Sequence, residues 1–344
     1  MGIKVLVVDD SITARTILNN ILKKYNFIES IETASDAYIA RDKVVKFKPN
    51  VICLDVEMPR MNGITFLKKL MKYMPIPVIM VSSFTTKGAK TTLEALEAGA
   101  LDFVAKPNSN TDKSKSEIEK DLIQKIKMAS EYKHKSQKQI FNKDILSYKD
   151  LKTTSQKIVA IGSSTGGTEA LKQILLKLPI NSPPIIIVQH MPISFTKQFA
   201  DTLDKICKVK VKETQNGDYI KNGHVFIAPG DKHMVLRTSG NKYYLEIGGG
   251  NKVSGHKPSI DVLFNSIAKV AAKNTVGVIL TGMGNDGAKG LLNLKLKGAK
   301  TLGQDEKTCI VYGMPKVAFN LGAVNKQIPI ENMASAIIKE LETI

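Results

Sequence analysis

Along the first 130 residues, short apolar runs alternate with stretches in which apolar residues recur every three or four positions. This pattern is typical of parallel strands joined by crossover helices. A last helix is predicted after Ser114, which forms a capping box with Glu117. The pattern therefore predicts a small doubly wound α/β domain whose five strands are Lys4–Val8, Ser30–Ala34, Val51–Leu54, Val78–Val81 and Asp102–Ala105.

The alternation stops and then resumes. Residues 131–156 are rich in Lys, Ser, Thr and Gln and have weak periodicity, which indicates an exposed linker. The segment Lys208–Gly250 contains turn signals such as Asn222-Gly223, so we expect a β-hairpin there. We divide the chain into a first domain at 1–130, a linker at 131–156 and a second doubly wound domain at 157–344, with apolar strands at Ile158–Ile161, Ile185–Val188, Val225–Ala228 and Gly277–Leu280.

Length and composition agree with two cores. The chain has 344 residues, of which 43% are hydrophobic and 24% charged. No apolar stretch approaches the roughly 20 residues that cross a bilayer, and the N-terminal apolar run ends in acidic residues, unlike a signal peptide. The three cysteines are far apart and lack metal-ligand spacing. We expect a cytoplasmic protein.

The net charge of +18, from 50 basic and 32 acidic residues, raises a nucleic-acid partner as an alternative. However, the basic residues are scattered, aromatic residues make up only 6% of the chain, and there is no Trp to stack on bases. No helix-turn-helix pattern is evident. We therefore expect no nucleic-acid partner, and a nucleic-acid-binding output module stays as the alternative to an enzyme.

Acidic side chains follow two strands of the first domain. Asp9 and Asp10 come after the first strand and Asp55 after the third, and the carboxyl ends of parallel strands share one crevice. Neighbouring carboxylates repel each other unless a hard cation such as Mg²⁺ neutralises them. Two further strand ends carry Ser82 and Lys106, a hydroxyl and an ammonium suited to a phosphoryl group. Together these residues predict a phosphoryl-accepting carboxylate site.

With the segment Met58–Gly63 after Asp55, the first domain resembles the response-regulator receiver family over almost its whole length. The resemblance implies a flavodoxin-like fold and a histidine kinase as phosphodonor. The roles that it implies are phosphoacceptor for Asp55, phosphoryl switch for Ser82 and Lys106, and Mg²⁺ ligands for Asp9, Asp10, Asp55 and the backbone carbonyl of Glu57.

In the second domain, a strand runs into the glycine-rich turn Gly162–Gly167 and then an amphipathic helix. A dinucleotide-binding loop needs glycine where Ser164 stands, and an acid at the end of the next strand, where the sequence has Gln189 and His190. Dinucleotide binding is therefore the weaker interpretation. Gly-x-Ser-x-Gly instead fits a serine nucleophile at a strand-to-helix turn, where helix-start N–H groups receive an oxyanion.

Two more strand ends supply partners for this serine. His190 ends the next apolar strand, and Asp286 follows the strand Val276–Leu280. Each residue alone has a structural explanation: a helix cap for Ser164 and for Asp286, and a buried core histidine for His190. At adjacent strand ends, the three predict a Ser-His-Asp hydrolytic site.

Four segments together resemble the CheB family of chemotaxis protein-glutamate methylesterases: Gly162–Gly167, Gln189–Pro192, Gly255–Ser259 and Thr281–Gly287. The resemblance spans both domains. It implies a Rossmann-like catalytic domain without a cofactor. Ser163 and Lys257 stand where the resemblance predicts Ala and Arg.

By this resemblance, Ser164 attacks the γ-methyl ester of a glutamate on a methyl-accepting chemotaxis receptor, His190 relays the proton and Asp286 orients His190. Deamidation of receptor glutamine is also implied. Our hypothesis for control is that the unphosphorylated receiver blocks the catalytic cleft, and that phosphorylation of Asp55 favours an open arrangement.

Overall fold

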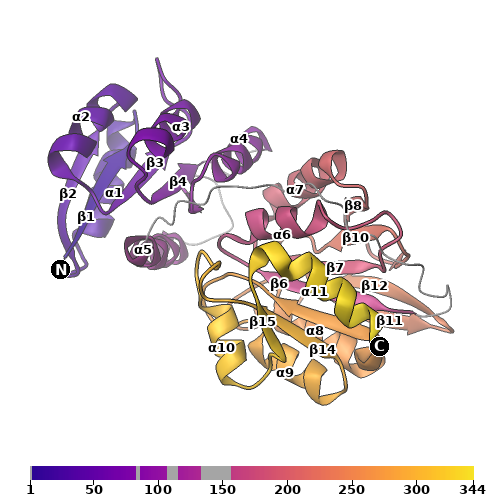
Figure 1. The fold of residues 1–344 in the computed structure, drawn as a ribbon. Helices are drawn as coiled ribbons and strands as arrows, with labels where there is room; N and C mark the ends of the chain where they lie inside the picture. The colour runs from indigo at the N-terminus through magenta and orange to yellow at the C-terminus, as the bar shows by residue number, and fades with distance from the viewer. Residues whose placement is uncertain (1, 83–85, 107–114, 133–155) are drawn as a thin grey trace. The chain divides into compact units, whose positions relative to one another are not determined.

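The computed structural model describes residues 2–82, 86–106, 115–132 and 156–344, and its contacts divide the chain into two compact units, Met1–Lys138 and Gln139–Ile344. Each unit is built on a parallel sheet (Figure 1). The expected capping residue Ser114 and most of the expected linker lie outside the described residues. None of the described helices has the length and apolar character needed to cross a membrane.

The first unit has the strand order β2-β1-β3-β4-β5, all parallel, which is the flavodoxin-like order expected from the sequence. The five predicted strands agree with the structure to within two residues at each end. The strands are β1 (Ile3–Val8), β2 (Ile28–Ala34), β3 (Val51–Asp55), β4 (Val78–Ser82) and β5 (Asp102–Ala105), and the helices are α1 (Ile12–Leu22), α2 (Ala37–Phe47), α3 (Gly63–Tyr73), α4 (Thr86–Glu97) and α5 (Lys115–Glu131).

The central strands of this sheet explain where its polar chemistry lies. Every residue of β3 and β4 is buried, as expected for parallel strands covered on both faces. The chain can therefore place its functional polar groups only where the strands end. Asp55 is the last residue of β3 and Ser82 the last of β4.

The second unit contains a seven-stranded parallel sheet in the order β15-β14-β13-β6-β7-β10-β8. Its strands are β6 (Ile158–Ser163), β7 (Ile185–Gln189), β8 (Lys210–Glu213), β10 (His224–Ile227), β13 (Thr275–Ile279), β14 (Lys300–Gln304) and β15 (Lys326–Ile328). Its helices are α6 (Gly167–Leu175), α7 (Ile193–Ile206), α8 (Ile260–Val270), α9 (Ala288–Leu296), α10 (Met314–Asn320) and α11 (Ile330–Glu342).

The connections of this sheet create a crevice at β6. From β6 the chain passes to β7 on one side, and β13 later pairs with β6 on the other side. Helices α6, α7 and α11 cover one face of the sheet and α8, α9 and α10 the other (Figure 1). Such a reversal of strand order is where ligand sites form in open α/β sheets, beyond the carboxyl ends of the strands.

The predicted hairpin is confirmed, but its turn was placed wrongly. Strands β11 (His233–Ser239) and β12 (Lys242–Gly248) pair antiparallel, and β9 (Asp218–Tyr219) adds a short third strand. The hairpin turn lies at Gly240-Asn241. Asn222-Gly223 instead leads into β10, because Gly223 takes a positive φ of 74° and donates its N–H to the carbonyl of Ser182 at 2.7 Å.

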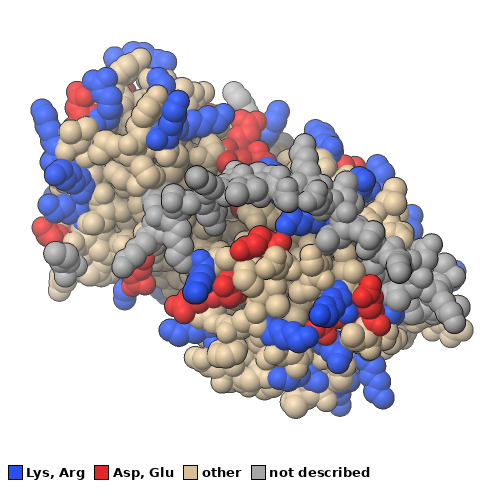
Figure 2. Space-filling view, viewed as in Figure 1, with Lys and Arg blue, Asp and Glu red and all other residues tan. Residues whose placement is uncertain are grey.

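The surface charge follows the scattered pattern of the sequence. Figure 2 shows Lys and Arg side chains on the drawn face of both units, interrupted by acidic and uncharged surface. They do not gather into one continuous stripe on that face. A stripe of this kind is the usual electrostatic footprint of a nucleic-acid-binding surface.

Candidate functional site

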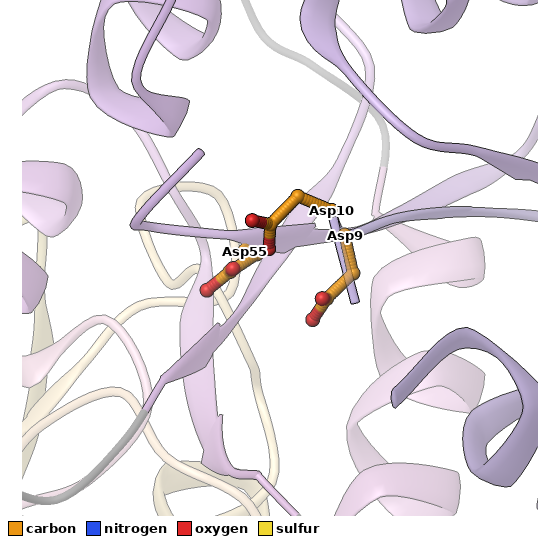
Figure 3. A group of neighbouring side chains, drawn as sticks. All are labelled: Asp9, Asp10 and Asp55. Carbon is orange, nitrogen blue, oxygen red and sulfur yellow. The ribbon is translucent and has the colours of Figure 1, made fainter. Parts of the chain in front are cut away.

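Three carboxylates meet at the carboxyl ends of β1 and β3. Oxygen atoms of Asp9, Asp10 and Asp55 all lie within 4.8 Å of one another (Figure 3). Asp9 and Asp55 are buried, whereas Asp10 is exposed. A pocket of about 310 Å³ joins Asp10 and Asp55 to the other residues predicted for this site, which are Glu57, Ser82 and Lys106.

Lys106 is the cation of this pocket. Its Nζ lies 2.9 Å from Asp9 Oδ2 and 2.8 Å from Asp55 Oδ2. Burial would lower the pKa of Lys106, but the two carboxylates more than offset it and raise the pKa. Burial raises the pKa of Asp55 from 3.8 to about 6. The hydrogen bonds from Lys106 and the Glu57 N–H lower this pKa, whereas the charge of Asp9 raises it further. The ammonium of Lys106 therefore does not offset the combined effect of burial and Asp9 on Asp55.

The donor set fits a divalent cation. Three carboxylates within reach of one ion offer the oxygen ligands that Mg²⁺ prefers. Burial, with the charge of Asp9, raises the pKa of Asp55, and a bound cation would favour its ionised form. The Ser82 hydroxyl, hydrogen-bonded to Thr92 Oγ1 at 3.0 Å, lies in the same pocket.

The turn after β6 places Ser164 at the crevice of the second unit. The Ser164 N–H donates to the carbonyl of Thr281 at 3.0 Å, which ties this turn to the loop after β13. Gly282 permits that approach, because a Cβ there would lie 2.6 Å from Ser164 Cβ. Gly166, at φ +77°, precedes α6 and gives it no side-chain cap, and the N–H of Gly167, the first helical residue, donates to the carbonyl of Ser164 at 2.7 Å.

His190 follows β7 and contacts Asp286 directly. Its Nε2 lies 2.8 Å from Asp286 Oδ2, whereas its Nδ1 is buried and has no hydrogen-bond partner among the described residues. The ring also stacks on His256, with centroids 3.7 Å apart. An Nε2–H that donates to Asp286 leaves Nδ1 as the basic nitrogen.

Ser164 Oγ is not hydrogen-bonded to His190, since His190 uses Nε2 for Asp286 and Nδ1 has no partner. The two residues are nevertheless held on adjacent segments, because β6 and β7 pair in register up to Ser163 and Gln189. Nucleophile–base bonds are often loose in free enzymes and tighten when substrate binds.

Asp286 is fully buried at the N-terminus of α8. Besides His190, it accepts hydrogen bonds from Ser259 Oγ at 2.8 Å and from the N–H groups of Ile260 at 2.7 Å and Asp261 at 3.1 Å. Burial would raise the pKa of Asp286, but the contact with His190 and these donors hold it below 3.8. The sequence alternative, a cap on α9, differs from the structure: Asp286 interacts with the start of α8.

Asp261 is a buried acid that sequence reasoning missed. It accepts hydrogen bonds from the Gly290 N–H at 2.7 Å and from Ser254 Oγ at 3.1 Å. Burial, with a contribution from Asp286, raises its pKa. In the sequence, Asp261 is an acid in the first turn of a helix capped by Ser259. That position indicates the start of a helix, and it does not indicate a contact with a second helix.

Other residues singled out in the sequence have local roles. His233 accepts a hydrogen bond from the Ser259 N–H at 3.2 Å and contacts the Asn251 carbonyl at 2.9 Å, so it supports the loop before α8. His224 contacts the carbonyl of Asn222. Lys257 forms an ion pair with Asp231 at 3.1 Å.

Comparison with known families gives two matches. The model of the CheB methylesterase family matches residues 159–337, and that of the response regulator receiver domain matches residues 5–116. Neither is a nucleic-acid-binding module or a dinucleotide-dependent enzyme, so both sequence alternatives lack support.

Similar proteins cover the whole chain. Proteins named protein-glutamate methylesterase/protein-glutamine glutaminase are 53% identical in Sulfurimonas denitrificans, over 97% of both chains, and 45% identical in Escherichia coli, over 98% of this chain and 97% of that protein. The crystal structure of the Thermotoga maritima CheB methylesterase catalytic domain matches 54% of this chain and 98% of its own, with 39% identity and a TM-score of 0.53. This chain therefore belongs to the CheB methylesterase family of ester hydrolases and carries a response regulator receiver domain at its N-terminal side.

Proposed function

We propose that the protein hydrolyses γ-methyl esters of glutamate, and deamidates glutamine, on chemotaxis receptors through Ser164, His190 and Asp286. The observation that carries the proposal is the buried contact of His190 Nε2 with Asp286 Oδ2 at 2.8 Å, one strand from the Ser164 turn. Relatives that are 45–53% identical over nearly the whole chain are named protein-glutamate methylesterase/protein-glutamine glutaminase, which supports glutamate methyl esters and glutamine side chains of proteins as substrates.

The chemistry starts at the free nitrogen of His190. Ser164 Oγ attacks the ester carbonyl while its proton passes to His190 Nδ1, and the ionised Asp286 stabilises the imidazolium. N–H groups at the start of α6 receive the developing oxyanion. His190 returns the proton to the leaving oxygen, and methanol departs. Water then attacks the acyl-enzyme by the same proton route and releases the glutamate; with glutamine, ammonia leaves instead.

We propose that Asp55 is the phosphoacceptor and that a chemotaxis histidine kinase is the donor. Asp9, Asp10, Asp55 and the carbonyl of Glu57 would hold Mg²⁺, which when bound offsets the negative charge on the carboxylates and the incoming phosphoryl oxygens. Lys106 Nζ, already 2.8 Å from Asp55, is placed to contact a phosphoryl oxygen, and Ser82 offers a hydroxyl in the same pocket.

We further propose that phosphorylation relieves inhibition by the receiver. The proposed phosphoacceptor and the proposed ester site lie in separate units of one chain. Phosphorylation of Asp55 can therefore change the esterase rate only through an effect of the receiver on the catalytic unit. Methanol release measured with and without a small phosphodonor tests it. Equal rates in the two conditions would contradict the proposal.

The esterase assignment is tested by methanol release from methylated receptor membranes. Ser164→Ala should lose on the order of 10³-fold or more in turnover, because the residues of such a site act as a unit. The neighbouring serine offers a graded comparison, since Ser163 Oγ donates to Gln189, and Ser163→Ala should lose only about fivefold in turnover. Full turnover in the Ser164→Ala variant would refute the assignment.

A further inference from the structure

A buried amide joins the two segments that carry the nucleophile and the base. Gln189 is the last residue of β7, and only 3% of it is exposed. Its Nε2 lies 2.9 Å from the carbonyl oxygen of Ser164 and 3.3 Å from that of His190. Its Oε1 accepts a hydrogen bond from Ser163 Oγ at 2.7 Å. We call this set of hydrogen bonds the Gln189 bridge.

The two carbonyls fix the orientation of the amide. A carbonyl oxygen can only accept, so Nε2 must face them, and Oε1 then accepts from the fully buried hydroxyl of Ser163. The opposite orientation would bring Oε1 against two carbonyl oxygens and leave acceptors unpaired in the interior, which is costly. Ser163 stands where the resemblance predicts Ala, whose side chain has no hydroxyl to make this hydrogen bond.

The surrounding chain leaves space for the bridge. A Cβ at Gly167 would lie 2.2 Å from Gln189 Oε1, so the last glycine of the turn makes room for the amide. On its other side, the His190 N–H donates to the Ser163 carbonyl at 3.0 Å. The backbones of the two segments are thus held together both by a strand-type bond and by one side chain.

We propose that Gln189, held in place by its hydrogen bond from Ser163, is a positioning residue for the hydrolysis: it sets the spacing between Ser164 and His190, and so the distance from Oγ to Nδ1. The inference rests on the proposed function. It matters because these two side chains are not yet hydrogen-bonded in this structure, and a shift of about 1 Å between reacting groups costs about 10²-fold in rate.

The test substitutes Gln189 by Met, which has a similar length and cannot make the three hydrogen bonds. Turnover of Gln189→Met should fall about 100-fold with little change in KM, since only the alignment in the transition state is lost. Gln173→Met is the matched control: Gln173 lies on α6, its side chain donates a hydrogen bond to Glu169 Oε1 at 3.4 Å, and the variant should keep the parental turnover. Circular dichroism at the assay temperature establishes that each variant is folded.

A double-mutant cycle separates positioning from general stability. Ser163→Ala should reduce turnover about fivefold, the equivalent of one neutral hydrogen bond, and should have no further effect in the Gln189→Met background. Additive effects, or parental turnover in folded Gln189→Met, would overturn the inference. If Gln189→Met does not fold, the turnover of Ser163→Ala tests the inference, because this variant keeps the glutamine. Parental turnover of Ser163→Ala would then overturn the inference.

A second readout does not depend on receptors. The rate at which a fluorophosphonate labels Ser164 reports its reactivity directly, with Ser164→Ala as the blank. We expect labelling of Gln189→Met to slow in parallel with turnover. If the parent protein labels but releases no methanol from receptors, the proposed substrate is wrong, while slower labelling of Gln189→Met still supports the bridge. Equal labelling of parent and variant overturns the bridge alone.

Discussion

Two buried carboxylates of this protein, Asp55 and Asp286, lie at the same kind of place and have opposite properties. Each lies at or beyond the carboxyl end of a central parallel strand, β3 for Asp55 and β13 for Asp286. Burial would raise the pKa of both. The pKa of Asp55 rises to about 6, whereas that of Asp286 falls below 3.8.

The difference comes from the donors around each group. Asp286 accepts from His190, from the Ser259 hydroxyl and from two N–H groups at the start of α8. Asp55 has the Lys106 ammonium and the Glu57 N–H, and the carboxylate of Asp9 lies within 4.8 Å of it. One carboxylate is thus held ionised and fixed, as an orienting group needs to be. For the other, burial and the nearby Asp9 disfavour the charged form, which suits a nucleophile that works with a cation.

The largest expected effect comes from removing the charge of Asp286. Asp286→Asn should lower turnover on the order of 10³-fold or more, because the amide cannot hold the His190 tautomer or stabilise the imidazolium. Methanol release under phosphodonor measures it. A loss of less than tenfold would show that the strong ionic character of this carboxylate is not used in catalysis.

The corresponding change in the receiver should act on regulation. Asp55→Asn should take up no phosphoryl group from a small phosphodonor and should show no phosphodonor stimulation, because the nucleophilic oxygen is replaced by an amide. Phosphate-affinity gel electrophoresis measures uptake. Asp102→Asn, which changes a buried acid at the start of β5, is the control and should keep uptake. Phosphorylation of Asp55→Asn would move the acceptor to another carboxylate.

Mg²⁺ should stabilise the receiver and not the catalytic unit. At a hundred times its dissociation constant, a cation that binds only the folded state adds about 2.7 kcal/mol to the free energy of unfolding. Asp10→Asn should reduce this gain, since the exposed Asp10 completes the three-carboxylate cluster. Thermal unfolding with Mg²⁺ or with chelator measures it. An equal gain in the Asp10→Asn variant would place the ion elsewhere.

The smallest effect is on the pH dependence of stability. The folded pKa of Asp286 is below its unfolded value of 3.8, so its contribution is fully present above 3.8 and is lost as the pH falls through the folded pKa. Asp286→Asn should therefore lower the free energy of unfolding by about 2 kcal/mol at neutral pH. The gap should close below 3.8 in urea titrations. A gap that persists unchanged in acid would assign it to packing instead of charge.

The sequence predicted the strand ends better than it predicted what surrounds them. Buried parallel strands such as β3 and β7 are continuous apolar runs, so the first polar residue after each run was placed to within about one residue. The edge strands of the second sheet carry no such signal: β8 is Lys-Val-Lys-Glu and β15 is Lys-Gln-Ile, and neither was predicted. The misplaced hairpin turn has a related cause, because Asn222-Gly223 and Gly240-Asn241 have the same local chemistry.

The candidate site shows the same limit. Ser164, His190 and Asp286 were found because each follows a buried strand, and the structure joins two of them directly. The donors to Asp286 come from residues 25–27 positions away in the chain, at the start of α8, and no local pattern indicates that long-range contact. Asp261 and the Gln189 bridge were missed for this reason, since their partners are backbone groups of other segments.

The N-terminal N–H groups of α8 and of α9 each donate to a carboxylate that belongs to the other helix or to the loop before it. Asp286, from the loop before α9, accepts from the first N–H groups of α8, and Asp261, from the first turn of α8, accepts from Gly290 in α9. Fraying of either helix end would strip donors from an acid on the other. The loop that carries Asp286 therefore cannot open by itself as surface loops usually do, and it shares the slow, cooperative opening of the interior.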